Sequence, residues 1–400
     1  MLRKLLLSSS LLTLLTLTFS LQVQAQDKED YLKTITTAVP FLSITPDSRA
    51  GAMADAGVAT SADVNSMYWN SAKLAFADKP LGFGVSYNPW LRKLVNDMSL
   101  SYISGYKKLR KEDAVGFSFK YFDLGQVTFT DNNGQVIRDF NPNELTLGVC
   151  YSRMLSKKFS VGLGLKYIRS DLSGNFTNSS TGQVAKAVNS ASADVGCYYN
   201  NEVFVGGRKY HIAFGANISD IGPKVTYTTF DNRDFIPTNL RIGTAITTNI
   251  DAYNKFTFAF DINKLLVPSP RPIYTQDVNG NYVYQGNEHS DKGVLGGMFS
   301  SFGDAPGGFK EEMKEYILSM AGEYWYNDLF AVRAGYHYES PQKGNRRYVT
   351  VGLGIRYQVF GLDLAYLIPV QQNNPLAESL RMSLLFNFDA KRKQESVQDN

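Results

Sequence analysis

The chain contains 400 residues, of which 20% are charged and 13% are aromatic, and its formal net charge is +4. A nearly neutral chain with interspersed charges gives no reason to expect a nucleic-acid partner. The chain has only two cysteines and three histidines, and we expect no disulfide, no metal site and no cofactor.

The first 25 residues read as a cleavable signal peptide. A basic start with Arg3 and Lys4 is followed by an apolar run and then by small residues at the cleavage positions, ending at Ala25. This order predicts removal of residues 1–25 during export. No cysteine lies near the predicted cut, so a lipoprotein anchor is not expected.

Residues 26–80 precede the first predicted strand, and their composition differs from that of the rest of the chain. A run of small residues extends from Ser48 to Ala59, and a second run extends from Asn65 to Phe76. If the strands that follow form a barrel, this segment can enter the lumen from the periplasmic side as a plug or hatch. An ordered periplasmic cap is the alternative.

After this segment, stretches of about ten residues alternate apolar and polar side chains, and a period of two indicates strands rather than helices. In residues 158–169, for example, Phe159 and Val161 oppose Ser160 and Gly162. The predicted strands comprise residues 81–88, 97–106, 113–122, 145–153, 158–169, 189–199, 209–219, 238–248, 254–262, 315–325, 329–338, 347–357, 360–368 and 380–388.

The connections between these strands alternate short and long from the second connection onward, and the longest comprises residues 263–314. Outer-membrane barrels have short periplasmic turns and long extracellular loops, and closure removes the unpaired edges that lipid does not tolerate. The pattern predicts an all-β transmembrane antiparallel barrel of about 14 strands over residues 81–388. A polar tail follows at residues 389–400. An even strand number should return both chain ends to the periplasm.

Charged residues of both signs occupy inward positions of the predicted strands. They can pair across a lumen, so we expect a solvated or salt-bridged interior, and a selectivity filter is the alternative. Inward glycines such as Gly162 and Gly352 leave room beside the wall that another segment can fill. The inward charged residues are Lys120, Lys166, Arg241, Arg333, Arg356, Arg381, Asp194, Asp261, Glu323 and Asp363.

The longest connection, residues 263–314, is the best candidate for a recognition surface. Pro268, Pro270 and Pro272 stiffen its first part, which also contains Tyr274. Apolar residues in its second part should face water, which indicates contact with a partner. Folding of the loop over the barrel mouth, which would bury the same groups, is the alternative. These apolar residues are Leu295, Met298, Phe299 and Phe302.

The histidines give little support for catalysis. His211 and His337 lie at opposite ends of the predicted barrel, and His289 lies in the longest loop. A nucleophilic triad needs a base and an orienting group in one place. We therefore assign no catalytic residue and expect the protein not to be an enzyme.

Two stretches of the N-terminal segment form a bipartite motif. Its residues are Arg49, Gly51, Asp55 and Gly57 in the first stretch, and Trp69 and Asn70 in the second. The motif resembles the N-terminal signature of the PorV family, also called LptO, which is similar in fold to FadL-type barrels. In the wider FadL-like group the second stretch reads Asn-Pro-Ala, and Ser71 replaces that proline here.

The resemblance implies a subunit of the type IX secretion system in the outer membrane of a Gram-negative bacterium of the Bacteroidota. Such a subunit binds secreted cargo through its C-terminal signal domain and associates with the giant translocon barrel. It passes the cargo to a sortase-like surface protease, which attaches it to lipopolysaccharide. Two other functions stay open: a FadL-type transporter of hydrophobic small molecules, and a general porin.

Overall fold

The computed structural model describes most of the chain. The predicted signal peptide, residues 390–400 of the polar tail and His289 lie outside the described residues. Of residues 272–276 and 282–287 only the backbone is described. The described residues are 34–91, 97–130, 133–174, 184–228, 233–276, 282–287, 291–371 and 379–389.

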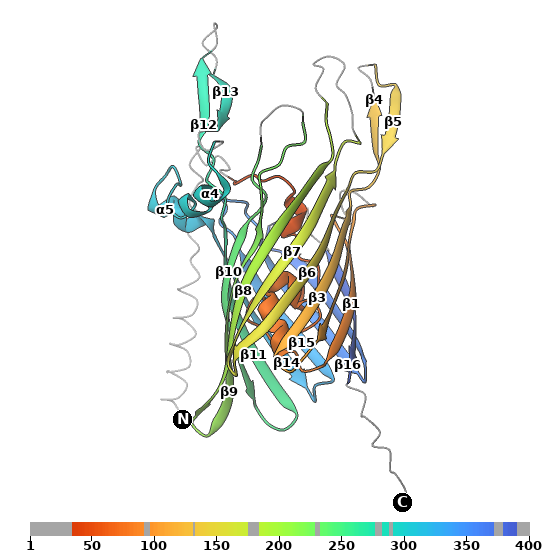
Figure 1. Ribbon diagram of the computed structural model, residues 1–400, viewed down its shortest axis with the longest axis vertical. Helices are drawn as coiled ribbons and strands as arrows, with labels where there is room; N and C mark the ends of the chain where they lie inside the picture. Colours follow the sequence, from red (N-terminus) through yellow and green to blue (C-terminus); the bar gives the residue numbers. More distant parts are fainter. Residues whose placement is uncertain are drawn as a thin grey trace, which may run out of the picture. The chain divides into compact units, whose positions relative to one another are not determined.

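In the described part of the chain, fourteen strands form one closed antiparallel barrel (Figure 1). They are β1 (Leu81–Pro89), β2 (Ser99–Lys108), β3 (Asp113–Asp123), β6 (Asn143–Ser156), β7 (Phe159–Asp171), β8 (Val188–Val205), β9 (Arg208–Ile221), β10 (Asn239–Asn249), β11 (Asn254–Leu265), β14 (Tyr316–Tyr326), β15 (Phe330–Tyr338), β16 (Arg347–Tyr357), β17 (Phe360–Pro369) and β18 (Leu380–Phe388). β1 pairs with β18, with Leu81 opposite Phe388, and this pairing closes the ring. The predicted fold class is confirmed.

Two hairpins lie inside the long loops and were not predicted. β4 (Val127–Thr130) pairs with β5 (Val136–Phe140), and β12 (Pro272–Gln276) pairs with β13 (Tyr282–Asn287), both apart from the barrel sheet. Each of these strands has only four to six residues. A run this short does not show the long alternation that marks a membrane-spanning strand.

The connection between β8 and β9 is shorter than the predicted residues 200–208. Only Gly206 and Gly207 separate the two strands, and their φ angles are 57° and 77°. Two residues with positive φ form the tight turn that suits the twist of a hairpin. The strands therefore continue to Val205 and resume at Arg208.

The two faces of the strands differ as a membrane barrel requires. Outward side chains such as Leu163, Leu165 and Phe214 are exposed, whereas inward neighbours such as Ser160 and Ser152 are fully buried. An apolar outer face is stable in hydrocarbon, where the closed ladder leaves no backbone group unsatisfied. Among the described residues, no helix is long and apolar enough to cross a membrane.

The N-terminal segment, which we define as residues 34–80, runs through the interior of the barrel (Figure 1, red and orange). It contains the short helices η1 (Pro40–Ser43), α2 (Ser48–Ala52), α3 (Ser66–Trp69) and η2 (Ser71–Phe76). Near its start, Phe41 packs with Leu100 and Phe122 beside the long loops. Near its end, Leu74 packs with Ala114 beside the short turns.

This path differs from the expected position of the chain ends. Thr34, the first described residue, lies at the end of the barrel that carries the long loops, which we call the long-loop end. The segment joins β1 at the opposite, short-turn end. An even strand number fixes where the barrel strands begin and end, but it does not fix the start of a segment that precedes them.

Inward glycines allow the backbone of this segment to approach the wall. A side chain at Gly215 on β9 would overlap the carbonyl oxygen of Val58, and one at Gly162 on β7 would overlap the backbone of Ala72. Because backbone atoms cannot move aside as a flexible side chain can, these two positions admit only glycine without a shift of the segment.

We predict that Gly215→Val displaces the N-terminal segment, because the new side chain meets the Val58 backbone. The variant should conduct ions in planar bilayers, whereas the unchanged barrel should conduct little. Gly322→Val is the matched control, because a Cβ at Gly322 meets only the Phe256 ring, at 3.2 Å. Equal conductance of the two variants would contradict the prediction.

Candidate functional site

Arg49 of the N-terminal segment belongs to a buried chain of ion pairs. Its guanidinium donates to both carboxylate oxygens of Glu323 on β14, at 3.0 and 2.8 Å. Arg333 on β15 donates to the same carboxylate at 2.7 Å and to Asp363 on β17 at 2.8 Å. Arg356 on β16 pairs with Asp363 at 2.7 Å. These inward charges are therefore salt-bridged, and the chain of ion pairs that begins at Arg49 ties the N-terminal segment to four strands.

Two further carboxylates fasten the segment to the wall. Asp55 pairs with Arg381 on β18 at 3.0 Å, and Gly51 leaves the space that the Arg381 side chain occupies. Asp261 on β11 accepts hydrogen bonds from the backbone N–H groups of Gly57 and the next residue, at 2.7 and 2.9 Å. Bonds to ionised groups are stronger than neutral ones, so these contacts fix the segment firmly.

The second half of the motif supports the first. The Trp69 ring lies against Gly57, where a side chain would overlap it, and its indole N–H donates to Asp47 at 2.7 Å. The Asn70 amide donates to the backbone carbonyl of Cys197 on β8 at 2.9 Å. Gly57 and the side chains of Trp69 and Asn70 thus pack and anchor the segment inside the barrel, and Trp69 and Asn70 are buried.

At the long-loop end, the connection after β11 folds into a cap (Figure 1). Its helices are α4 (Val294–Ser300), α5 (Phe309–Glu312) and η3 (Met313–Glu315). Pro268 is buried and Pro270 is half-buried, so the proline run supports the cap more than it faces water. Pro272 and Tyr274 begin the β12 hairpin, where only the backbone is described.

Buried ion pairs hold the cap to the barrel. Lys264 at the end of β11 donates to Glu312 at 2.6 Å and to Glu315 at 2.9 Å. Lys343, in the connection before β16, donates to Glu311 at 2.8 Å and to Glu315 at 2.9 Å. Burial alone would raise the pKa of Glu315, but the hydrogen bonds from the two lysines hold this pKa below its ordinary value. The glutamate is therefore charged at neutral pH.

Several apolar side chains of this cap are exposed. Phe299 and Phe309 are 77% and 78% exposed. Met298 differs from the expectation because α4 turns it toward the cap interior, where it is buried. We name the exposed group the cap surface, and it consists of Leu295, Phe299, Phe302, Phe309 and Met313.

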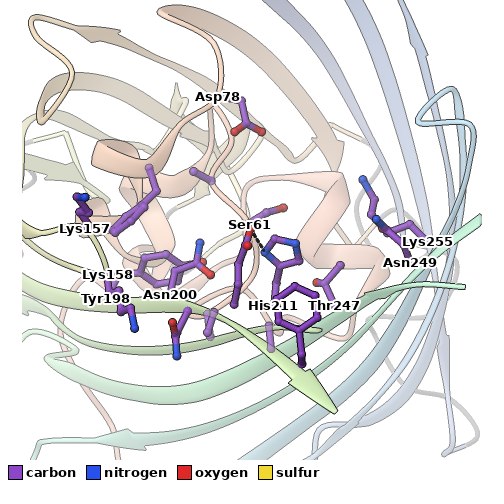
Figure 2. Close-up of a pocket in the computed structure, with 18 residues that line it drawn as sticks. Ser61, Asp78, Lys157, Lys158, Tyr198, Asn200, His211, Thr247, Asn249 and Lys255 are labelled. Carbon is purple, nitrogen blue, oxygen red and sulfur yellow. Dashed lines mark ion pairs between the residues drawn. The ribbon is translucent and has the colours of Figure 1, made fainter. Parts of the chain in front are cut away.

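Two cavities lie at opposite ends of the barrel. The short-turn cavity has a volume of about 850 Å³, and Figure 2 shows Lys157, Asn200 and Lys255 among its polar lining residues. The long-loop cavity, of about 400 Å³, is lined by residues that include Arg241 and His337. Polar, charged and apolar side chains together line both cavities, whereas sites for small hydrophobic ligands are lined mainly by apolar side chains.

The two described histidines do not share a site. His211 lines the short-turn cavity and lies 3.6 Å from Glu202, whereas His337 is buried at the long-loop end. Within the described ranges, no group of three or more His, Cys, Asp or Glu residues is arranged to hold a metal ion. The described contacts of the interior serve packing and charge neutralisation.

We predict that Glu323→Gln destabilises the barrel by about 3–5 kcal/mol, because it leaves Arg49 and Arg333 buried without their shared carboxylate. Urea unfolding of the detergent-solubilised protein measures this loss. Asp328→Asn is the control, because the Asp328 pair with Lys255 is solvent-exposed and should contribute less than about 1 kcal/mol. Equal unfolding midpoints for both variants would show that the buried chain of ion pairs does not hold the N-terminal segment in place.

Comparison with solved structures finds similar folds. The CymD monoaromatic hydrocarbon channel is 12% identical with a TM-score of 0.50, and the match covers 87% of this chain and 98% of that one. The Pseudomonas putida toluene transporter TodX is 12% identical with a TM-score of 0.49 and coverages of 87% and 99%. A FadL homologue from Pseudomonas aeruginosa is 12% identical with a TM-score of 0.45 and coverages of 86% and 99%. At these identities the likeness concerns the fold alone.

Comparison with curated proteins gives no match. A family model described as "Type IX secretion system protein PorV" matches residues 25–272, which is more than half of the chain. The matched region contains the whole N-terminal segment with its Arg49–Asn70 motif. The FadL-like barrel and this match together indicate an outer membrane of a Gram-negative bacterium. The chain belongs to the PorV family, and it is a component of the type IX secretion system.

Proposed function

We propose that this barrel binds secreted cargo through the cargo's C-terminal signal domain and carries it from the giant translocon barrel to a sortase-like surface protease. Family membership supports this role, and the exposed cap surface is the single observation that carries it in the structure. The sortase-like partner performs the chemistry and attaches the cargo to lipopolysaccharide. The barrel itself needs no catalytic residue, and the host belongs to the Bacteroidota.

The cap surface has the properties of a docking site. Exposed apolar side chains grouped on one part of a protein mark sites of protein contact, and phenylalanine is enriched at such contacts. Buried pairs of Lys264 and Lys343 with glutamates hold the surface in place. A preformed surface loses less conformational entropy when a partner binds, so more of the contact energy appears as affinity.

A FadL-type transporter of hydrophobic small molecules is the second candidate, and the barrel fold favours it. Transport needs an apolar pocket and a path through the lumen. Here charged residues form part of the lining of both cavities, and the Arg49–Glu323 ion pair lies within the interior. A general porin is supported less, because the N-terminal segment occupies the space that a water-filled channel requires.

We predict that the double variant Phe299→Asp and Phe309→Asp lowers cargo recovery at least about tenfold, because two exposed contact residues are lost. Affinity purification from native membranes, with quantification of secreted proteins by mass spectrometry, measures this change. Phe204→Asp is the control, because Phe204 is also exposed but lies on the β8–β9 hairpin at the short-turn end. Unchanged cargo recovery, with a folded barrel, would contradict the proposal.

A further inference from the structure

Arg241 on β10 lines the long-loop cavity and is buried, with 6% of its surface exposed. Its guanidinium lies over the rings of Tyr68 and Trp69, at 5.1 and 5.2 Å from their centroids. Among the described residues it has no carboxylate or other hydrogen-bond partner, unlike the inward arginines 333, 356 and 381. The Asp261 carboxylate acts on this arginine without contacting it, so the guanidinium N–H groups are available for an anion that enters the cavity.

A second buried cation lies over the ring of the same tyrosine. The Lys120 Nζ is 4.9 Å from the Tyr68 ring centroid and donates to the carbonyls of Phe41 and Ile44, at 2.8 and 2.6 Å. Within the described residues it forms no ion pair with a carboxylate. The carbonyls satisfy its hydrogen bonds, and the carboxylates of Asp220 and Glu144 act on its charge only from beyond contact distance.

The acidic residues that line the cavity do not contact Arg241, because each is already paired. Asp55 pairs with Arg381 at 3.0 Å, and Glu315 pairs with Lys264 and Lys343. Glu339 is the third, and it binds the Arg346 guanidinium through two hydrogen bonds of 2.8 Å. A carboxylate that enters the cavity can therefore bind Arg241 without displacing any of these three acids.

Two side chains of the cavity lining have buried polar atoms that lack a partner in the described part of the chain, and these atoms are the imidazole Nε2 of His337 and the side-chain oxygen of Asn263. The Nδ1 of His337 lies 3.2 Å from the carbonyl oxygen of Ala54 and 3.1 Å from the Ser319 hydroxyl. Both unpartnered atoms have almost no accessible surface, so a ligand reaches them only if these side chains turn toward the cavity.

We infer that the long-loop cavity binds the C-terminal end of a peptide chain. The terminal carboxylate meets the guanidinium N–H groups of Arg241, which lies against the rings of Tyr68 and Trp69. The cavity extends from exposed rim residues, Thr34 and Arg346, to the buried floor, so a chain end can enter it from the long-loop side. This inference rests on the proposed function, in which cargo arrives with its C-terminal domain.

The test uses the full barrel in detergent and a fluorescent hexapeptide with the last residues of the cargo domain. One form of the peptide has a free carboxylate and the other a C-terminal amide. We expect anisotropy to show that amidation weakens binding on the order of tenfold to a hundredfold, as loss of a charge-assisted contact should. Arg241→Gln should weaken binding of the free acid by the same factor as amidation does. The variant should bind the amide as well as the wild type does, because amidation and the substitution remove the same interaction.

Arg153→Gln is the matched control, because Arg153 is an exposed arginine near the short-turn end and should not alter affinity. Amidation cannot affect folding of the barrel, so the peptide pair tests the site even if the Arg241 variant assembles poorly. Equal binding of acid and amide, or no binding of either, would overturn the inference. Binding of the intact cargo domain is measured in parallel: if it persists in that case, the proposed function stands and only the cavity assignment fails.

Discussion

The structure depends on one constraint, which is that a strand in hydrocarbon must hydrogen-bond all of its backbone to other strands. Pairing of β1 with β18 meets this requirement by closing the ring. Closure also turns half of the strand side chains inward, including charged residues such as Glu323, Arg333 and Asp363, which are almost fully buried. The interior must therefore supply partners for these charges, and the N-terminal segment supplies several of them.

This requirement explains what the Arg49–Asn70 motif does. Arg49 neutralises Glu323, Asp55 neutralises Arg381, and the glycines of the motif let ring and side-chain atoms approach the backbone. The N-terminal segment is thus an integral part of the barrel core and differs from a loosely held hatch. Around Arg241, which no carboxylate contacts among the described residues, a cavity opens toward the long loops. In the proposed function, the inward charges that balance the lumen also serve recognition at its mouth.

Much of the fold could be predicted because a strand between lipid and lumen alternates strictly, so the fourteen barrel strands were recognisable from residues such as those of 158–169. The inward positions of the charged residues could be predicted from the same alternation. Alternation says nothing about packing between distant segments. The sequence therefore did not reveal that Thr34 lies at the long-loop end, that Met298 is buried, or that Arg241 has no carboxylate partner among the described residues. The β4–β5 and β12–β13 hairpins were missed because their strands are short.

The central claim is that the barrel is a filled scaffold whose long-loop end recognises exported proteins. Native mass spectrometry of the wild-type barrel, extracted from its own membranes in mild detergent, tests this claim most directly. The account predicts complexes in which the barrel carries secreted proteins that share a C-terminal signal domain. A barrel that carries hydrophobic small molecules in its lumen and no secreted protein would contradict the account and favour transport.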